Sequence, residues 1–86
     1  MTFQFSQHAL KQMDLRGISR EMVDNILLAP EQTVEQENLI VFQNIIKDSM
    51  EQRYLIRVFI NFDKTPPLIV TVYRTSKIEK YYEGKI

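Results

Sequence analysis

The stretch that decides the fold spans residues 53–75 and has the sequence RYLIRVFINFDKTPPLIVTVYRT. Its first part, 53–62, and its last part, 68–75, are rich in the β-branched and aromatic residues that favour strands. The connector between them, 63–67, is short and polar, and this length suits a hairpin better than a parallel crossover. We therefore predict two antiparallel strands.

Alternation along these strands predicts which side chains share a face, since successive strand residues point to opposite sides. If Phe62 lies opposite Leu68, Phe59 faces Thr71 and all even-numbered positions of both strands lie under the helices. A one-residue slip would mix the faces, so we expect a well-specified register. The second face is then predicted to collect Arg53, Arg57, Ile69, Thr71, Tyr73 and Thr75, with Lys77 extending the row.

Two helices are predicted before the strands. Ser6 is a suitable cap for a helix that runs to about Arg16, and Gly17 is placed to adopt the left-handed conformation at its end. Ser19 is the next cap, and apolar residues at helical spacing continue a second helix to about Leu28.

The remaining segments complete a single domain covering residues 1–86. Further strands are expected at 33–37 and 39–46, again joined by short polar connectors. No repeat or glycine-rich linker divides the chain. The predicted fold is α+β, with two N-terminal helices followed by a four-stranded antiparallel sheet.

Composition limits the classes of function. Hydrophobic residues make up 44% of the 86 residues and charged residues 26%, as in ordinary globular domains. There is no cysteine, and His8 is the only histidine, so we expect no disulfide, no metal site and no cofactor. The formal net charge of +0 argues against a simple nucleic-acid binder, although basic residues outnumber acidic ones near the C-terminus.

Hydropathy gives an expectation for location. The longest mainly apolar stretch, 39–46, is far shorter than the ~20 residues that a membrane helix needs. The N-terminal residues do not resemble a secretory leader. We therefore expect a cytoplasmic protein that does not interact with membranes.

The residues of the second sheet face suggest a chemistry. Arginine and lysine beside hydroxyl groups are suited to holding a phosphate. In metal-free RNA cleavage a base removes the proton of the ribose 2′-hydroxyl, cations stabilise the phosphorane and an acid protonates the leaving oxygen. Histidine is a common general acid or base in proteins, so His8 is a candidate for one role, and Tyr73, Tyr81 or a lysine can take the other. Each residue alone has an ordinary explanation in strand propensity, packing or solubility, but their convergence on one face favours a site.

Several motifs resemble a small bacterial family of unknown function. Ser6-Gln7-His8-Ala9, Met13 and Arg16-Gly17-Ile18-Ser19 fit a pattern close to S-x-H-A-x-x-R-M-x-x-R-G-I, with Gln12 where that family has a basic residue. Residues 53–58 and 69–73, followed by Lys77 and Lys80-Tyr81, resemble its later strands and its K-x-x-K-Y ending. That family is similar to the RelE, ParE and BrnT toxins of toxin-antitoxin systems.

The resemblance implies an endoribonuclease whose sheet face binds RNA and whose partner is a cognate antitoxin. Together with the face pairing, it predicts a catalytic set of His8, Arg57 and Tyr73. The predicted RNA-binding or phosphate-binding residues are Arg16, Arg53, Thr71, Thr75, Lys77 and Lys80.

The alternative is a non-catalytic interaction domain of the same fold, which binds a protein partner or forms a homodimer. Neutral charge favours this class. The edge at 33–37 and exposed Leu55, Phe59 and Ile69 would supply the contact. A small-ligand module is a third class, for which the sequence contains no motif.

Overall fold

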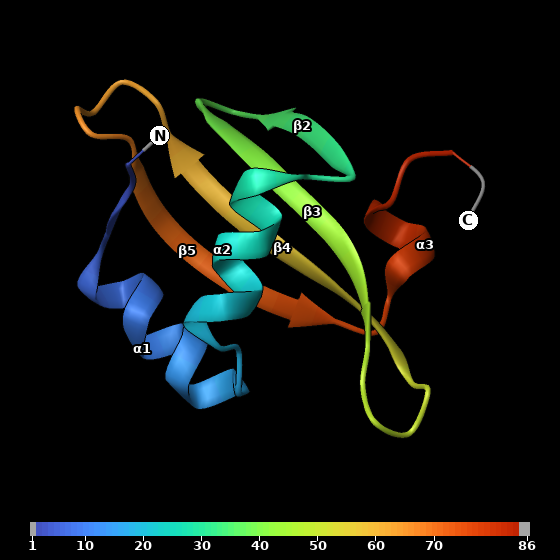
Figure 1. The fold of residues 1–86 in the computed structure, drawn as a ribbon. Helices are drawn as coiled ribbons and strands as arrows, with labels where there is room; N and C mark the ends of the chain where they lie inside the picture. The colour runs from blue at the N-terminus through green and yellow to red at the C-terminus, as the bar shows by residue number, and fades with distance from the viewer. Residues whose placement is uncertain (1, 85–86) are drawn as a thin grey trace.

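The computed structural model describes residues 2–84 as three helices and one five-stranded sheet (Figure 1). The strand order in the sheet is β1-β5-β4-β3-β2. Two helices, α1 and α2, cover one face of this sheet. In chain order the elements are β1 (Gln4–Phe5), α1 (Gln7–Arg16), α2 (Arg20–Leu28), β2 (Gln32–Gln36), β3 (Leu39–Lys47), β4 (Arg53–Asn61), β5 (Leu68–Thr75) and α3 (Ile78–Tyr81).

The first two helices begin and end as the sequence predicts. The Ser6 hydroxyl oxygen accepts a hydrogen bond from the Ala9 N–H at 2.9 Å, and the Ser19 hydroxyl oxygen accepts one from the Met22 N–H at 3.1 Å. Both serines are therefore N-caps. Gly17 ends α1 in the left-handed conformation with φ 64°, which a residue without a Cβ adopts at little cost.

The sheet corrects the prediction of four antiparallel strands. A fifth strand, β1, pairs in parallel with β5; the Gln4 N–H donates to the Pro67 carbonyl at 2.9 Å and the Ser6 N–H to the Ile69 carbonyl at 3.0 Å. Two residues are too short to show an alternating pattern, so β1 has no signal in the sequence. The third helix, α3, was missed for the same reason, since it has only four residues.

The register between β4 and β5 is partly as predicted. Arg57 lies opposite Tyr73 and Phe59 opposite Thr71, which confirms the pairing on the second face. Between Phe59 and Ile60 the register shifts, so that Ile60 lies opposite Ile69. The extra residue in β5 is a bulge that turns Ile69 toward the helices, and the prediction that Ile69 shares the mixed face was therefore wrong.

The main core lies between the helices and the even-numbered side chains of β4. Ile56, Val58 and Ile60 are at most 1% exposed and pack with Ala9 and Met13 of α1. Burying side chains of this size contributes about 1.5–3 kcal/mol each. This packing fixes the direction of the odd-numbered side chains of β4, which point to the opposite face.

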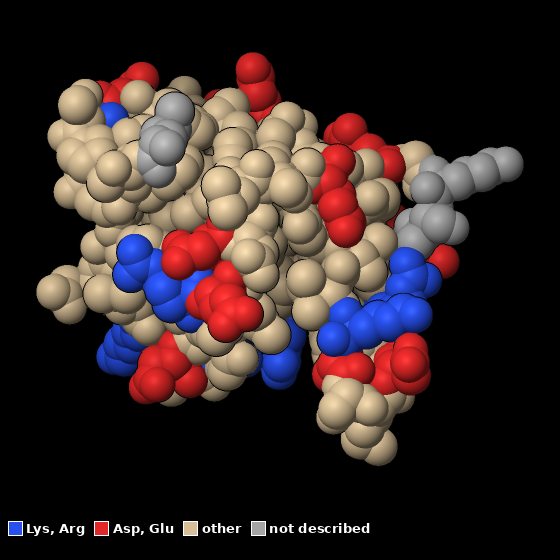
Figure 2. Space-filling view, in the orientation of Figure 1, with Lys and Arg blue, Asp and Glu red and all other residues tan. Residues whose placement is uncertain are grey.

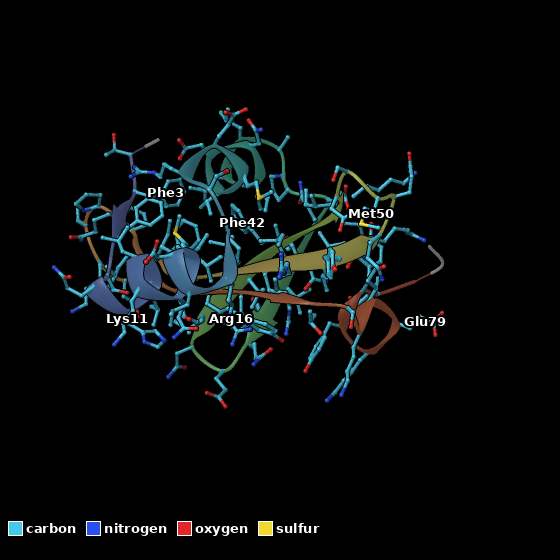
Figure 3. The ribbon with its side chains drawn as sticks, turned by 90° about the horizontal axis from the view of Figure 1, so that it is seen from below. Phe3, Lys11, Arg16, Phe42, Met50 and Glu79 are labelled. Atoms are coloured by element: carbon cyan, nitrogen blue, oxygen red, sulfur yellow. The ribbon has the colours of Figure 1, made fainter. Side chains whose placement is uncertain are left out.

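The second face is also covered, at the end of the sheet where α3 lies (Figure 3). Leu55 is 0% exposed, Phe59 8% and Ile69 0%. The expectation that these three side chains form an exposed apolar contact was therefore wrong, because Ile69 is in the helix-side core and α3, whose Ile78 is itself buried, adds a layer over the second face. The edge position of β2 was predicted correctly.

Candidate functional site

The chain after β5 crosses the second face and is held there by side chains of β2 and β3. The Gln43 amide donates to the Tyr81 carbonyl at 3.1 Å. The Gln32 side chain accepts from the Glu83 N–H at 3.0 Å and donates to the Glu83 carbonyl. These bonds place the aromatic ring of Tyr81 over the middle of the sheet.

Arg57 of β4 lies at the centre of this arrangement and is only 3% exposed. Its Nε donates to Gln43 Oε1 at 2.8 Å, one terminal nitrogen donates to the Tyr73 hydroxyl at 3.2 Å, and the other donates to Gln36 Oε1 at 3.3 Å. Gln43 is opposite Arg57 in the β3–β4 register and is fully buried. The pleat of the sheet thus brings an amide and a guanidinium together inside the protein.

No carboxylate neutralises Arg57 within residues 2–84, whose two ion pairs, Arg20–Asp24 and Lys47–Glu51, are both exposed. Instead its guanidinium carbon lies 4.4 Å from the ring centre of Tyr81, 5.2 Å from that of Phe59 and 5.9 Å from that of Tyr73. Removing a cation from water costs several kcal/mol. Hydrogen bonds to a charged group return about 1.5–3 kcal/mol each, and cation–π contacts about 0.5–2 kcal/mol, so neutral groups offset this cost.

The two phenols beside Arg57 have pKa values shifted in opposite directions. Burial raises the pKa of Tyr73 above its ordinary value, against the opposing hydrogen bond from Arg57. The hydrogen-bonding influence of Tyr73, and then that of Lys80, lowers the pKa of Tyr81. The rings of Tyr73 and Tyr81 are 6.2 Å apart in an edge-to-face arrangement. A pair of titratable groups with pKa values driven apart is suited to act as acid and base.

Four of the predicted site residues lie on the second face along β4 and β5: Arg57, Tyr73, Thr71 and Thr75. Arg57 and Tyr73 are in direct contact. The Thr75 hydroxyl oxygen accepts a hydrogen bond from the Lys77 N–H at 3.1 Å, which shapes the turn into α3. Thr71 lies opposite Phe59, one step further along the face.

Three predicted cations, Arg53, Lys77 and Lys80, line an open hollow next to α3. The hollow is formed by residues 50–52 of the β3–β4 loop, Arg53 at the start of β4, and residues 76–80. Of its two carboxylates, Glu51 is already paired with Lys47 at 3.3 Å, which leaves Glu79. The hollow therefore has an excess of positive charge although the whole chain has none.

The structure places His8 and Arg16 away from this group. Both are exposed on α1, whose Ala9 and Met13 pack on the helix side of the sheet. Arg16 donates to Gln12 Oε1 at 3.2 Å, and Figure 3 shows it at the end of α1, at a distance from Glu79 and α3. His8 and Arg57 therefore lie on opposite sides of the sheet.

Sequence reasoning missed the glutamines that organise the site. Gln43 accepts from Arg57 and donates to Gln32 at 2.8 Å, while Gln36 accepts from Arg57. The available signal was two adjacent amides, Gln43 and Asn44, inside a strand that is otherwise mostly apolar. Gln43 is the one that is fully buried. A buried polar residue needs a partner, and the partner on the neighbouring strand is Arg57.

The helix side of the surface has mixed charge. On the helix side, Lys and Arg alternate with Asp and Glu, without a large area of one sign (Figure 2). None of the helices in residues 2–84 has the length and apolar character required to cross a membrane. In the same described part of the chain, His, Asp and Glu side chains do not gather in groups of three that could hold a metal ion.

Comparison with known proteins identifies a family. Neither the curated proteins nor the solved structures contain a match to this chain. Residues 5–74 match the family described as "Domain of unknown function (DUF4258)". The match includes Gln43, Arg57 and Tyr73 and ends before α3. Because it covers most of the 86 residues, the chain belongs to the DUF4258 family.

Proposed function

We propose that this protein is a metal-independent endoribonuclease with a RelE-like fold, acting in the cytoplasm as the toxin of a toxin-antitoxin system. The site is the face of β4 and β5 that carries Arg57 and Tyr73, together with Tyr81 of α3. The proposal also includes a neutralising antitoxin as the partner of this chain.

The observation that carries the proposal is the buried Arg57, which has no carboxylate partner in the described chain and contacts two phenols with separated pKa values. A purely structural polar cluster does not require a cation, since an apolar residue of similar volume is often at least as stabilising. A permanent cation behind two phenols instead provides an electrostatic environment for proton transfer and for a developing negative charge.

The chemistry assigns different roles to the phenols. Tyr81, as phenolate, accepts the proton of the ribose 2′-hydroxyl, and the 2′-oxygen attacks the adjacent phosphorus. Tyr73, whose raised pKa keeps it protonated, donates a proton to the leaving 5′-oxygen as the P–O bond breaks. The products are a 2′,3′-cyclic phosphate and a free 5′-hydroxyl, so that protons and charge balance.

The cations divide between the buried and exposed parts of the site. Arg53, Lys77 and Lys80 are exposed and bind the phosphates of the substrate. Arg57, which lies under the ring of Tyr81, acts through the phenols as a positioning and electrostatic residue. In this assignment proton transfer does not need His8, which lies on the other side of the sheet.

We expect the purified protein to cleave RNA in the presence of EDTA and to leave cyclic phosphate ends. RNA products are separated on a denaturing gel, with and without ribosomes, and their ends are identified by mass spectrometry.

His8→Ala is expected to retain activity. Expression of the chain alone is expected to arrest growth. Intact RNA at high protein concentration in both settings would contradict the proposal and favour the non-catalytic interaction domain, for which β2 has a free edge.

The pH dependence of cleavage tests the role of Tyr81. A base acts when deprotonated, so kcat/KM is expected to rise with pH and level off at a pKa below that of ordinary tyrosine, because that of Tyr81 is lowered. Tyr81→Phe keeps the ring over Arg57 but removes this rise, with a loss of roughly 10²–10⁴-fold at the plateau. A rise centred near the ordinary histidine pKa of about 6.5, abolished by His8→Ala, would show instead that His8 is the base.

A further inference from the structure

A second contact between an arginine and an aromatic ring lies at the end of the sheet next to the site. The guanidinium carbon of Arg74 is 4.8 Å from the ring centre of Tyr54. Arg74 of β5 lies opposite Ile56 of β4, two residues beyond Tyr54. Such diagonal neighbours are within reach of long side chains on one face, so the pair is fixed by the strand register. Both residues lie on the helix side of the sheet.

The Tyr54 ring is half-buried against the protein, whereas Arg74 is exposed to solvent. Tyr54 lines a small hollow with Met22, Ile46 and Ile56. The same hollow is also lined by the charged residues Lys47 and Asp48. The outer face of the guanidinium is left available to a planar ligand.

The Arg74–Tyr54 contact differs from the similar contact of Arg20 with Phe5 in whether the arginine forms an ion pair. Arg20 lies 4.0 Å above the ring of Phe5 and is paired with Asp24 at 3.3 Å. Arg74 is not in an ion pair with any of the residues 2–84. Asp48 lines the same hollow, but its carboxylate accepts hydrogen bonds from the Met50 and Gln52 N–H groups and forms no ion pair with Arg74. A solvated cation that lies over an aromatic ring is suited to an anionic ligand that also has a flat ring.

This pair is adjacent to the hollow that we propose binds phosphate. Arg53 and Tyr54 are consecutive residues of β4, and because successive strand residues alternate, Arg53 points to the face of the hollow and Tyr54 to the helix side. On β5, Arg74 lies only three residues before Lys77, which also lines the hollow. One extended polyanion passing around this end of the sheet can contact both.

We infer that Arg74 on Tyr54 is a base-stacking platform, on which a nucleotide next to the cleaved phosphate of a single-stranded RNA stacks. The inference rests on the proposed function and names its substrate class. Unpaired bases stack on guanidinium planes as they do on aromatic rings, and any base can take this position. Bases inside a duplex are not available to it, so the platform favours single strands.

The test measures binding separately from cleavage. The ligand is a fluorescent single-stranded oligonucleotide of about ten nucleotides, 2′-O-methylated throughout so that attack by the 2′-oxygen is blocked. Fluorescence anisotropy gives its Kd for the wild type and for Arg74→Gln, Arg74→Lys and Arg20→Gln, each checked for folding by circular dichroism. A duplex of the same sequence is measured in parallel.

We expect Arg74→Gln to raise the Kd for the single strand roughly tenfold, which corresponds to the loss of one stacked base. Arg74→Lys retains the charge without the plane and is expected to lose nearly as much. Arg20→Gln is expected to leave the Kd unchanged, and the duplex is expected to bind more weakly and to be less sensitive to Arg74→Gln.

Three results would overturn the inference: absence of binding by the wild type, an unchanged Kd for Arg74→Gln, or full recovery of binding by Arg74→Lys, which would indicate a simple phosphate contact. Cleavage of the unmodified RNA separates the two proposals. Binding that depends on Arg74 with RNA left intact supports the platform and contradicts the nuclease. Cleavage with a kcat/KM that Arg74→Gln leaves unchanged supports the nuclease and contradicts the platform.

Discussion

Replacement of Arg57 by methionine is expected to lower the kcat/KM of RNA cleavage by roughly 10²–10³-fold, the usual effect of removing one fixed electrostatic group from an active site. Arg57 is 3% exposed, so methionine removes a buried charge while filling part of the same volume. Without the guanidinium, the Tyr73 hydroxyl loses its donor at 3.2 Å and Tyr81 loses the cation 4.4 Å from its ring. The phenolate of Tyr81 then forms less readily.

The same substitution is expected to change stability little. Methionine removes the several kcal/mol of desolvation that the guanidinium costs, while Gln43 Oε1 loses its donor, which costs about 1–3 kcal/mol. Arg20→Met, which also removes an arginine from an aromatic ring, is the matched control and should leave kcat/KM unchanged. A folded Arg57→Met variant with wild-type kcat/KM would remove the electrostatic role from the proposal.

The face on which Arg57 lies was predictable because strand alternation has a period of two. Its pairing with Tyr73 was derived by placing Phe62 opposite Leu68, which was wrong, because Asn61 lies opposite Leu68. The extra residue in β5 offsets this difference and leaves Arg57 opposite Tyr73. Every even position from Ile56 to Ile60 is apolar, and this pattern alone fixes the direction of Arg57. The bulge opposite Phe59 was not predictable, since Leu68, Ile69 and Val70 are all apolar and fit either face. Local hydrophobicity does not decide among three equivalent residues; the packing of the whole core does.

The burial of Arg57 could not be predicted for a different reason. It depends on Tyr81, which reaches the sheet only because Gln32 and Gln43 hold the chain after β5. These are hydrogen bonds over long sequence separations, and the four-residue α3 has too few residues to show a helical period. The sequence showed that basic residues gather near the C-terminus. That Lys77 and Lys80 line the hollow follows from the position of the chain after β5 on the second face.

Truncation of the buried amide, Gln43→Leu, is expected to destabilise the protein by about 2–3 kcal/mol, because the Arg57 Nε–H then lies in the interior without an acceptor and hydrogen bonds to charged groups contribute about 1.5–3 kcal/mol. The substitution also removes the donor to the Tyr81 carbonyl. For a domain of this size, about 2 kcal/mol lowers Tm by roughly 8–16 °C. Urea unfolding, with Gln7→Leu as the exposed glutamine control, measures the change.

The double variant Arg57→Met, Gln43→Leu tests whether the destabilisation by Gln43→Leu arises from the unpaired guanidinium of Arg57. If the cost of Gln43→Leu arises from the stranded cation, removal of that cation recovers most of it, and the double variant is more stable than Gln43→Leu alone. The two apolar side chains then face each other in adjacent strands, at the position where guanidinium and amide meet in the wild type. If the two losses simply add, Arg57 does not need Gln43 as its acceptor, and the guanidinium must be held by Gln36, Tyr73 and the surrounding rings alone.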